Sequence, residues 1–138
     1  MPIHAVMAAY KRAWENRDSK AFDEVFAPGG EYWHSPFEAH NTSFERAAHW
    51  MKVSELTDIA FDYMVLAESS EHGIAHWTAS FEVGSEAQLR MWLASPPSST
   101  TQVEAFKRLE VDGTLLAQFD ASGQATLVRT WWKATGQT

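Results

Sequence analysis

The sequence predicts an α+β fold in which a curved, mixed or antiparallel sheet forms a cone, and three N-terminal helices enclose a pocket. Apolar residues recur at helical spacing as far as about residue 54, and from residue 57 onward they recur with a period of two, which is typical of strands. Turn-forming residues at 68–73 and 120–123 separate the strand segments, as in an antiparallel meander. Helices that precede a run of strands favour an α+β architecture. The 138 residues are interpreted as one domain over 1–138.

The first two helices are predicted from apolar stripes and an N-cap. Residues 3–16 place their apolar side chains on one stripe, which indicates an amphipathic helix. Asp18 is a suitable N-cap for a second, shorter helix that ends at Ala27, before Pro28-Gly29-Gly30.

The third helix is predicted to begin after Thr42, which forms a capping box with Glu45, and to end near residue 54. Four apolar residues lie at helical spacing along it and are expected to form its buried face. These residues are Phe44, Ala47, Ala48 and Met51.

The remaining elements are strands. The stretch EYWHSPF at 31–37 is predicted to be a short strand that ends at Pro36, between the second and third helices. The later strands are expected at 57–67, 74–83, 102–119 (broken near 112–113) and 124–134. Residues 85–101 give a weak signal, and their apolar side chains suit either a lid over the pocket or an arm that reaches a second subunit.

Composition excludes several classes of function. The chain has no cysteine, so disulfides, thiolate metal sites and cysteine nucleophiles are excluded. A net charge of −7 without a basic run argues against nucleic acid as a partner. No signal peptide and no apolar stretch of membrane-spanning length is visible, so we expect a cytoplasmic protein with no membrane partner. The histidines and carboxylates lack metal-ligand spacing, and we expect neither a metal nor another cofactor.

Four stretches, YKRAWENRDSKAFDEVFA, EYWHSPFEAH, IAHWTASFE and LEVDGTLLAQFDASGQATLVRTWW, make the chain resemble the nuclear transport factor 2-like superfamily, including its SnoaL-like members. The resemblance covers nearly the whole chain except about 85–101. It implies a cone-shaped pocket closed by helices and a homodimer formed through the outer sheet face. It implies no single activity, because this fold carries isomerases, dehydratases, epoxide hydrolases, cyclases and binding domains.

Two enzyme types of this superfamily are poorly matched. Ketosteroid isomerases use a tyrosine, matched here by Tyr10, but their aspartate base corresponds to Ser35 and their late aspartic acid to Leu115. An unassisted serine cannot remove a proton from carbon, because its pKa is far too high. In limonene-type epoxide hydrolases an arginine and two aspartates act, and the matching positions are the non-ionisable Trp77, Ala79 and Thr130.

The same resemblance fixes which strand residues are expected to face the pocket. It places the residue before Pro36 inside, so strand alternation sends His34 to the opposite face, as it does His76. A register error of one residue would reverse these assignments. The expected pocket residues are Tyr10, Trp14, Trp33, Ser35, Trp77, Ala79, Phe81, Leu115, Thr130 and Trp132.

If the protein is an enzyme, its acid–base group must come from a short list of candidates. Scytalone dehydratase-like sites use histidines, which leaves His34 and His76 as candidates beside Tyr10. Asp62 becomes a buried acid if its strand turns it inward. The ordinary interpretation of the two histidines is packing at a helix–sheet or dimer interface. His40 is expected in the loop before the third helix, with a rim or hydrogen-bonding role, and His49 at the surface or at an interface.

Three functions therefore remain open at this stage. The first is a binding protein whose apolar, aromatic pocket holds a small cyclic lipophilic molecule. The second is an enzyme of the isomerase, dehydratase or polyketide-cyclase type, with Tyr10 as hydrogen-bond donor and a histidine or Asp62 as acid–base. The third is a dimeric interaction module whose cone is filled by core side chains.

Overall fold

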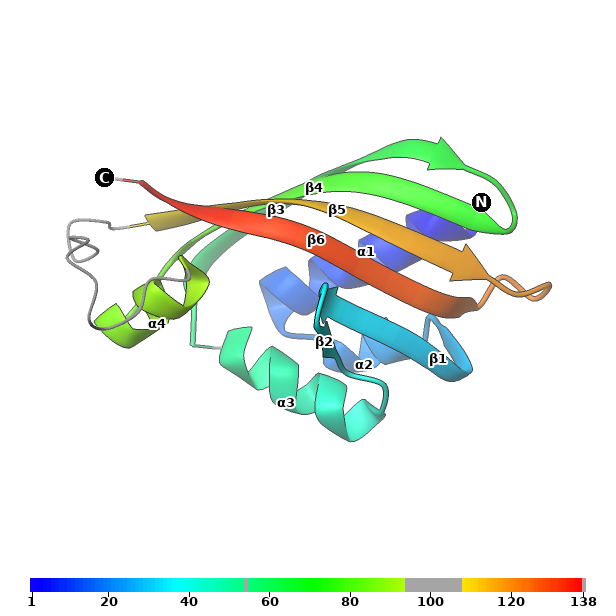
Figure 1. Ribbon diagram of the computed structural model, residues 1–138, viewed down its shortest axis with the longest axis horizontal. Coiled ribbons are helices and arrows are strands. Elements are labelled where there is room, and N and C mark those ends of the chain that lie inside the picture. The colour runs from blue at the N-terminus through cyan, green and yellow to red at the C-terminus, as the bar shows by residue number, and fades with distance from the viewer. Residues whose placement is uncertain (54, 94–107, 138) are drawn as a thin grey trace.

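The structure is a computed structural model that describes residues 1–53, 55–93 and 108–137. A long, curved sheet lies over the helices α1, α2 and α3 (Figure 1). None of the described helices has the length and apolar character that crossing a membrane requires. The elements in chain order are α1 (Pro2–Asn16), α2 (Ser19–Asp23), β1 (Phe26–Ser35), β2 (Glu38–Ala39), α3 (Ser43–Val53), β3 (Thr57–Glu68), β4 (His72–Glu82), α4 (Glu86–Trp92), β5 (Arg108–Phe119) and β6 (Ala125–Gln137).

The sheet is mixed, as the sequence predicted. Its strand order is β2-β1-β6-β5-β4-β3, and β1 runs parallel to β6 while the other neighbours are antiparallel. The predicted hairpin of β3 and β4 and the turn at 120–123 are both present. The pairing of β1 with β6 places the strand that follows α2 beside the last strand of the chain.

The second helix is shorter than predicted. Asp18 caps it as expected, because its carboxylate accepts a hydrogen bond from the Ala21 N–H at 3.0 Å. The helix ends at Asp23, and Phe26 already belongs to β1, where it pairs with Ala125. The apolar pattern predicted a helix as far as Ala27, but from Phe26 onward the chain pairs with the last strand instead.

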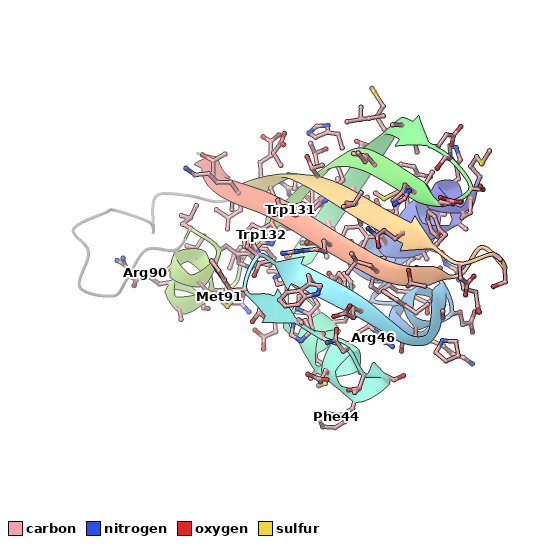
Figure 2. The ribbon with its side chains drawn as sticks, turned by 45° about the vertical axis from the view of Figure 1, so that its right-hand side comes forward. Phe44, Arg46, Arg90, Met91, Trp131 and Trp132 are labelled. Atoms are coloured by element: carbon pink, nitrogen blue, oxygen red, sulfur yellow. The ribbon has the colours of Figure 1, made fainter. Side chains whose placement is uncertain are left out.

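The third helix turns the opposite face inward from the one predicted. Its predicted buried stripe is exposed, with Phe44 at 84% and Met51 at 70%, and Phe44 points away from the sheet (Figure 2). The buried residues are Arg46, His49 and Trp50. The capping box is confirmed by the Glu45 N–H, which donates to the Thr42 hydroxyl at 3.1 Å.

A largely buried ion pair lies on the inward face of α3. The Arg46 guanidinium contacts the Asp23 carboxylate of α2, donates to the His40 carbonyl oxygen at 3.3 Å, and lies 4.7 Å from the Phe26 ring centroid. These contacts require Arg46 to face inward, and an apolar period alone does not reveal them.

The fourth helix falls within the segment that gave a weak sequence signal. Ser85 caps α4 through the Gln88 N–H, and Leu89 and Trp92 are buried against the rest of the core. Trp92 packs 5.0 Å from Phe81 and 5.2 Å from Trp132, measured between ring centroids. Residues 94–101 of the predicted lid or arm lie outside the described residues, so its role stays a prediction.

Candidate functional site in the aromatic interior

The inner face of β1 carries Tyr32 and His34, not Ser35 and Trp33. Tyr32 and His34 are buried, whereas Trp33 and Ser35 are half-buried on the opposite face. The expected register of this strand is therefore wrong by one residue. The Trp33 ring lies 5.0 Å from the guanidinium carbon of Arg129 on the outer face of β6. The pairing of β1 with β6 is irregular between Phe26 and Glu31, so buried and exposed side chains do not alternate regularly along the first half of β1.

The other strands face as predicted. Trp77, Ala79 and Phe81 of β4, Leu115 of β5 and Thr130 of β6 are all buried on the helix-facing side of the sheet. Trp132 is half-buried against the same core, and Tyr10 and Trp14 of α1 close it from the other side. This places the side chains; their role as ligand contacts stays a prediction.

The polar centre of this interior is a hydroxyl cluster, formed by Tyr10, Tyr32 and Thr130. The Thr130 hydroxyl donates to the carbonyl oxygen of His34 and, at 3.3 Å, to that of Trp33. Tyr10 interacts with the side chains of Trp14, Tyr32 and Thr130. These groups come from α1, β1 and β6, so the cluster connects the first helix to the neighbouring strands β1 and β6.

Both phenols of the hydroxyl cluster stay neutral at physiological pH. Burial raises the pKa of Tyr10 to about 12, and the nearby polar side chains of Trp14, Tyr32 and Thr130 offset part of this effect. Burial, together with the neighbouring Tyr10, also raises the pKa of Tyr32 well above its ordinary value. They can therefore donate hydrogen bonds to an oxygen atom but cannot act as bases at neutral pH.

Several buried donors of the interior have no acceptor among the described residues. They are the indole nitrogens of Trp14, Trp50 and Trp77 and the hydroxyl of Tyr32. Leaving a buried polar group unpaired costs about 1–3 kcal/mol, so each such donor needs an explanation such as water or a ligand. The described interior thus holds several unpaired donors, which could bond to an oxygen atom.

Aromatic rings occupy much of the space around Tyr10. Its ring centroid lies 5.5 Å from those of Phe22, Phe61 and Trp77, 5.8 Å from Trp50 and 6.4 Å from Trp14. Most of these pairs meet edge to face, the favourable arrangement for aromatic rings. The interior is thus a packed aromatic cluster, and a bound molecule must displace or separate rings.

A second group of titratable residues adjoins the hydroxyl cluster. We call His34 of β1, His40 after β2 and His49 of α3 the histidine cluster. The ring centroid of His49 lies 4.1 Å from that of His34 and 4.8 Å from that of His40, and His34 and His49 are only 8% and 6% exposed. The Tyr32 ring lies 6.0 Å from His49, which connects the two clusters.

The structure corrects the expected location of His34, which was predicted on the outer face but is buried on the inner one. His49, expected at the surface or at an interface, is buried, and His40 lies in the loop before α3, as predicted, and packs against both. The signal that sequence reasoning missed is the spacing of Arg46, His49 and Trp50, which lie on one helical face. In the described residues, no group of three or more histidine and acidic side chains is arranged to hold a metal ion.

Two of the four candidate catalytic residues lie away from this interior. Asp62 is exposed on the outer face of β3, while its neighbour Tyr63 packs against the core. His76 lies on the outer face of β4, as predicted, and its ring nitrogen contacts both Asp112 oxygens at 3.0 Å. The structure therefore brings Tyr10 and His34 into one interior and leaves Asp62 and His76 outside it.

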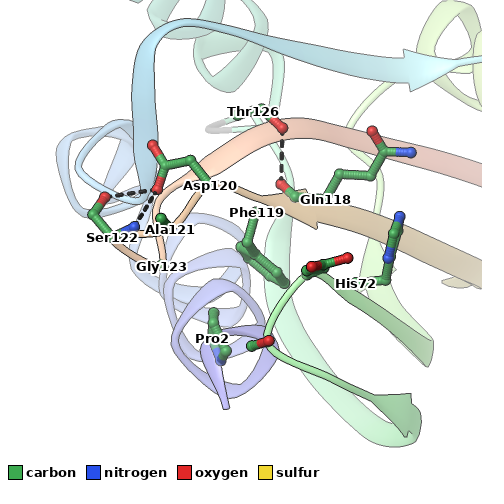
Figure 3. Close-up of a pocket in the computed structure, with 11 residues that line it drawn as sticks. Pro2, His72, Gln118, Phe119, Asp120, Ala121, Ser122, Gly123 and Thr126 are labelled. Carbon is green, nitrogen blue, oxygen red and sulfur yellow. Dashed lines mark hydrogen bonds between the residues drawn. The ribbon is translucent and has the colours of Figure 1, made fainter.

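A polar hollow at the far end of the sheet is a second place where a ligand could be considered. It has a volume of about 650 Å³ and lies between Pro2, the β3–β4 turn and the β5–β6 turn (Figure 3). Its Asp120 carboxylate accepts hydrogen bonds from the Ser122 hydroxyl at 2.6 Å and the Gln124 N–H at 3.1 Å, and these bonds lower its pKa. The carboxylate is thus already used to close the turn.

Comparisons with known proteins identify the fold. No family model and no curated protein sequence matches the chain. Among solved structures, it is similar to the epoxide hydrolase/cyclase-like enzyme SalBIII, which has a role in pyran ring formation in the polyether salinomycin. The identity is 12%, the match covers 96% of this chain and 93% of that one, and the TM-score is 0.64.

Two further solved structures are similar over most of their length. One is a hypothetical protein with a ketosteroid isomerase-like fold from Catenulispora acidiphila, in complex with trimethylamine (10% identity, 93% and 85% coverage, TM-score 0.64). The other is RV0760c from Mycobacterium tuberculosis (10% identity, 98% and 99% coverage, TM-score 0.66). The chain thus has the nuclear transport factor 2-like fold that its sequence predicted, and identities this low establish the fold alone.

Proposed function

We propose that the protein binds a small, mostly apolar cyclic molecule in its aromatic interior and holds an oxygen of that molecule at the hydroxyl cluster. The observation that carries this proposal is the surplus of buried donors: the Tyr32 hydroxyl and the indoles of Trp14, Trp50 and Trp77 have no acceptor among the described residues. A carbonyl or ether oxygen would satisfy such donors, while the surrounding rings would bury its hydrocarbon part.

The experiment is a tryptophan-fluorescence titration with cyclic ketones, sterols, lactones, epoxides and polyketide-like aromatics. It includes 1-indanone and indane, which have the same ring system and differ by one carbonyl group. We expect a saturable change in emission with 1-indanone, because several tryptophans line the interior. No response to any class would contradict the proposal and would favour an interior that is simply filled core.

The Tyr10→Phe variant links the binding to the hydroxyl cluster. Its affinity for 1-indanone should fall by about tenfold, the equivalent of one hydrogen bond, while its affinity for indane stays the same. Equal losses for both probes would mean that the Tyr10 hydroxyl supports the packing and does not contact the ligand.

A second candidate function is acid–base catalysis of the isomerase, dehydratase or cyclase type. The observation that favours it is the inward position of His34 near the end of β1, next to the position at which the resemblance to ketosteroid isomerases places the base. An imidazole can remove a proton from carbon next to a carbonyl while a neutral phenol such as Tyr10 donates to the oxygen. Turnover that survives His34→Gln would exclude this candidate.

We also infer that two copies associate through the outer face of the sheet. This face exposes Met64 at 64%, Leu66 at 57% and Trp131 at 39%. The Arg129 guanidinium carbon lies 5.0 Å from the Trp33 ring centroid and 5.3 Å from that of Trp131. Tryptophan and arginine are enriched at the centres of protein interfaces, which supports a contact surface here.

A further inference from the structure

We propose that the histidine cluster is an acid-sensitive closure of the interior: α3 and the β1–β2 hairpin stay packed against the aromatic core while these rings are mostly neutral, and they separate when the rings are protonated. This inference assigns a regulation to the binding site proposed above and rests on that proposal for its function. The physical effect itself does not require a ligand.

The geometry of the three rings limits how many protons the folded cluster accepts. The ring centroids of His34 and His49 are 4.1 Å apart, and those of His40 and His49 are 4.8 Å apart. Two imidazolium charges at such distances repel each other strongly, because the effective dielectric constant of a buried site is far below that of water. The central ring, His49, is in contact with both of the others.

The charged groups around the histidine cluster provide a partner for one proton. Glu38 of β2 places a carboxylate oxygen 3.7 Å from His34 Nε2, where it can pair with one protonated ring. Arg46 of α3 donates to the His40 carbonyl, but the Asp23 carboxylate of α2 balances its charge, so this pair adds no net charge beside the rings. Tyr32 of β1 is neutral because its pKa is raised, and Trp132 of β6 carries no charge.

Separation of these rings would open the candidate site. The three histidines come from β1, the loop after β2 and α3, so their contacts join α3 to the β1–β2 hairpin. The Thr130 hydroxyl of the hydroxyl cluster bonds to the His34 carbonyl, and the Tyr32 ring lies 6.0 Å from His49. Movement of β1 or α3 therefore displaces the groups proposed to hold the ligand.

The first test is urea unfolding at about pH 7.5 and about pH 5 on the wild type and two variants. Each proton that the fold excludes should raise the unfolding equilibrium constant by about thirtyfold over this interval, for an unfolded histidine pKa of about 6.5. In His49→Gln, which removes one of these protons, the rise of the unfolding equilibrium constant between the two pH values should be about thirtyfold smaller than in the wild type. His72→Gln, which changes an exposed histidine at the start of β4, should behave as the wild type.

Equal acid sensitivity of His49→Gln and the wild type would overturn the proposal. A second measurement covers the case in which this variant fails to fold. In wild-type protein below pH 6, amide hydrogen exchange corrected for its intrinsic pH dependence should show at least tenfold lower protection in α3 and β1, with β4 and β5 unchanged. A uniform loss, or none, would also overturn the proposal. Neither test uses a ligand, so failure here leaves the binding proposal standing.

Discussion

At the scale of single residues, Gly113 determines where the indole of Trp77 can lie. A Cβ added at Gly113 would come within 2.5 Å of the Trp77 ring, so the indole rests directly on the backbone of β5. Trp77 in turn stacks 5.6 Å from Phe61 and lies 5.5 Å from Tyr10. The absence of one side chain thus positions the aromatic rings that surround the hydroxyl cluster.

We expect Gly113→Ala to destabilise the protein by about 1–3 kcal/mol, because the added methyl group overpacks a filled core and forces Trp77 to move. Urea unfolding followed by fluorescence measures the change. Gly84→Ala is the control, since a Cβ there meets nothing within 4 Å. If Gly113→Ala were as stable as this control, the indole would be free to shift, and the interior would be looser than the structure indicates.

The buried phenol of Tyr10 predicts a loss of stability at alkaline pH. Its folded pKa of about 12 exceeds the unfolded value of 10.0, so the unfolded chain releases the proton first. The buried neutral phenol therefore contributes about 2–3 kcal/mol to the free energy of unfolding. This contribution is fully present below about pH 10 and is lost as the pH rises toward 12. Urea unfolding at about pH 8 and about pH 11 should therefore show a smaller loss in Tyr10→Phe than in wild type.

Tyr63→Phe is the matched control for this alkaline effect. Tyr63 lies on the inner side of β3 and is only half-buried. This variant should lose as much stability as the wild type between the two pH values. A Tyr10→Phe variant with an unchanged loss would show that other groups cause the alkaline effect.

At the scale of elements, the Arg46–Asp23 pair joins α2 to α3. The Arg46 side chain is 8% exposed and that of Asp23 is 22% exposed. Arg46→Met should destabilise the protein by about 3 kcal/mol, the lower end for a broken buried pair, because Asp23 keeps some contact with water. Arg12→Met, which removes the exposed partner of Asp18, should cost at most about 1 kcal/mol.

Similar losses of stability for these two variants, measured by urea unfolding, would mean that α3 is held mainly by Trp50 and its aromatic contacts. In that case the inward orientation of α3 would not depend on Arg46. The exposed apolar stripe of Phe44 and Met51 would then need another cause.

The sequence predicted the elements well and their facing less well. The helical stripe of α1, the β3–β4 hairpin and the caps Asp18 and Thr42 are signals of local chemistry, and the structure confirms them. The faces of β1 and α3 depend on contacts between distant residues, such as Arg46 with Asp23 and Trp33 with Arg129. Such contacts leave no mark in a local period, which explains the error for α3. The expected face of β1 came instead from the resemblance, which placed Ser35 inside.

The same distinction applies to the candidate site. Tyr10 and Thr130 were predicted to share one interior, and the structure brings them together with Tyr32. The resemblance supplied their positions on a helix and a late strand. His40 and His49 were missed because their cluster forms only when a loop and α3 fold over the end of β1.

At the scale of the whole molecule, the curved sheet separates two chemical environments. The inner face carries the aromatic rings and the hydroxyl cluster, whereas the outer face of the central strands carries polar pairs such as His76 with Asp112. The proposed ligand binding and the proposed association of copies can therefore be tested by separate substitutions, one on each face of the sheet.

The proposed dimer gives the last prediction. Wild-type protein should sediment at twice the mass of the chain, and Trp131→Glu should shift it to the monomer, because the substitution removes an aromatic side chain from the centre of the interface and buries a charge there. Met51→Glu places the same charge on the exposed face of α3, away from the sheet, and should leave the dimer intact. Dissociation by Met51→Glu alone would move the interface to α3. A wild-type monomer would exclude the dimer and leave Trp33, Arg129 and Trp131 as a solvent-facing stack.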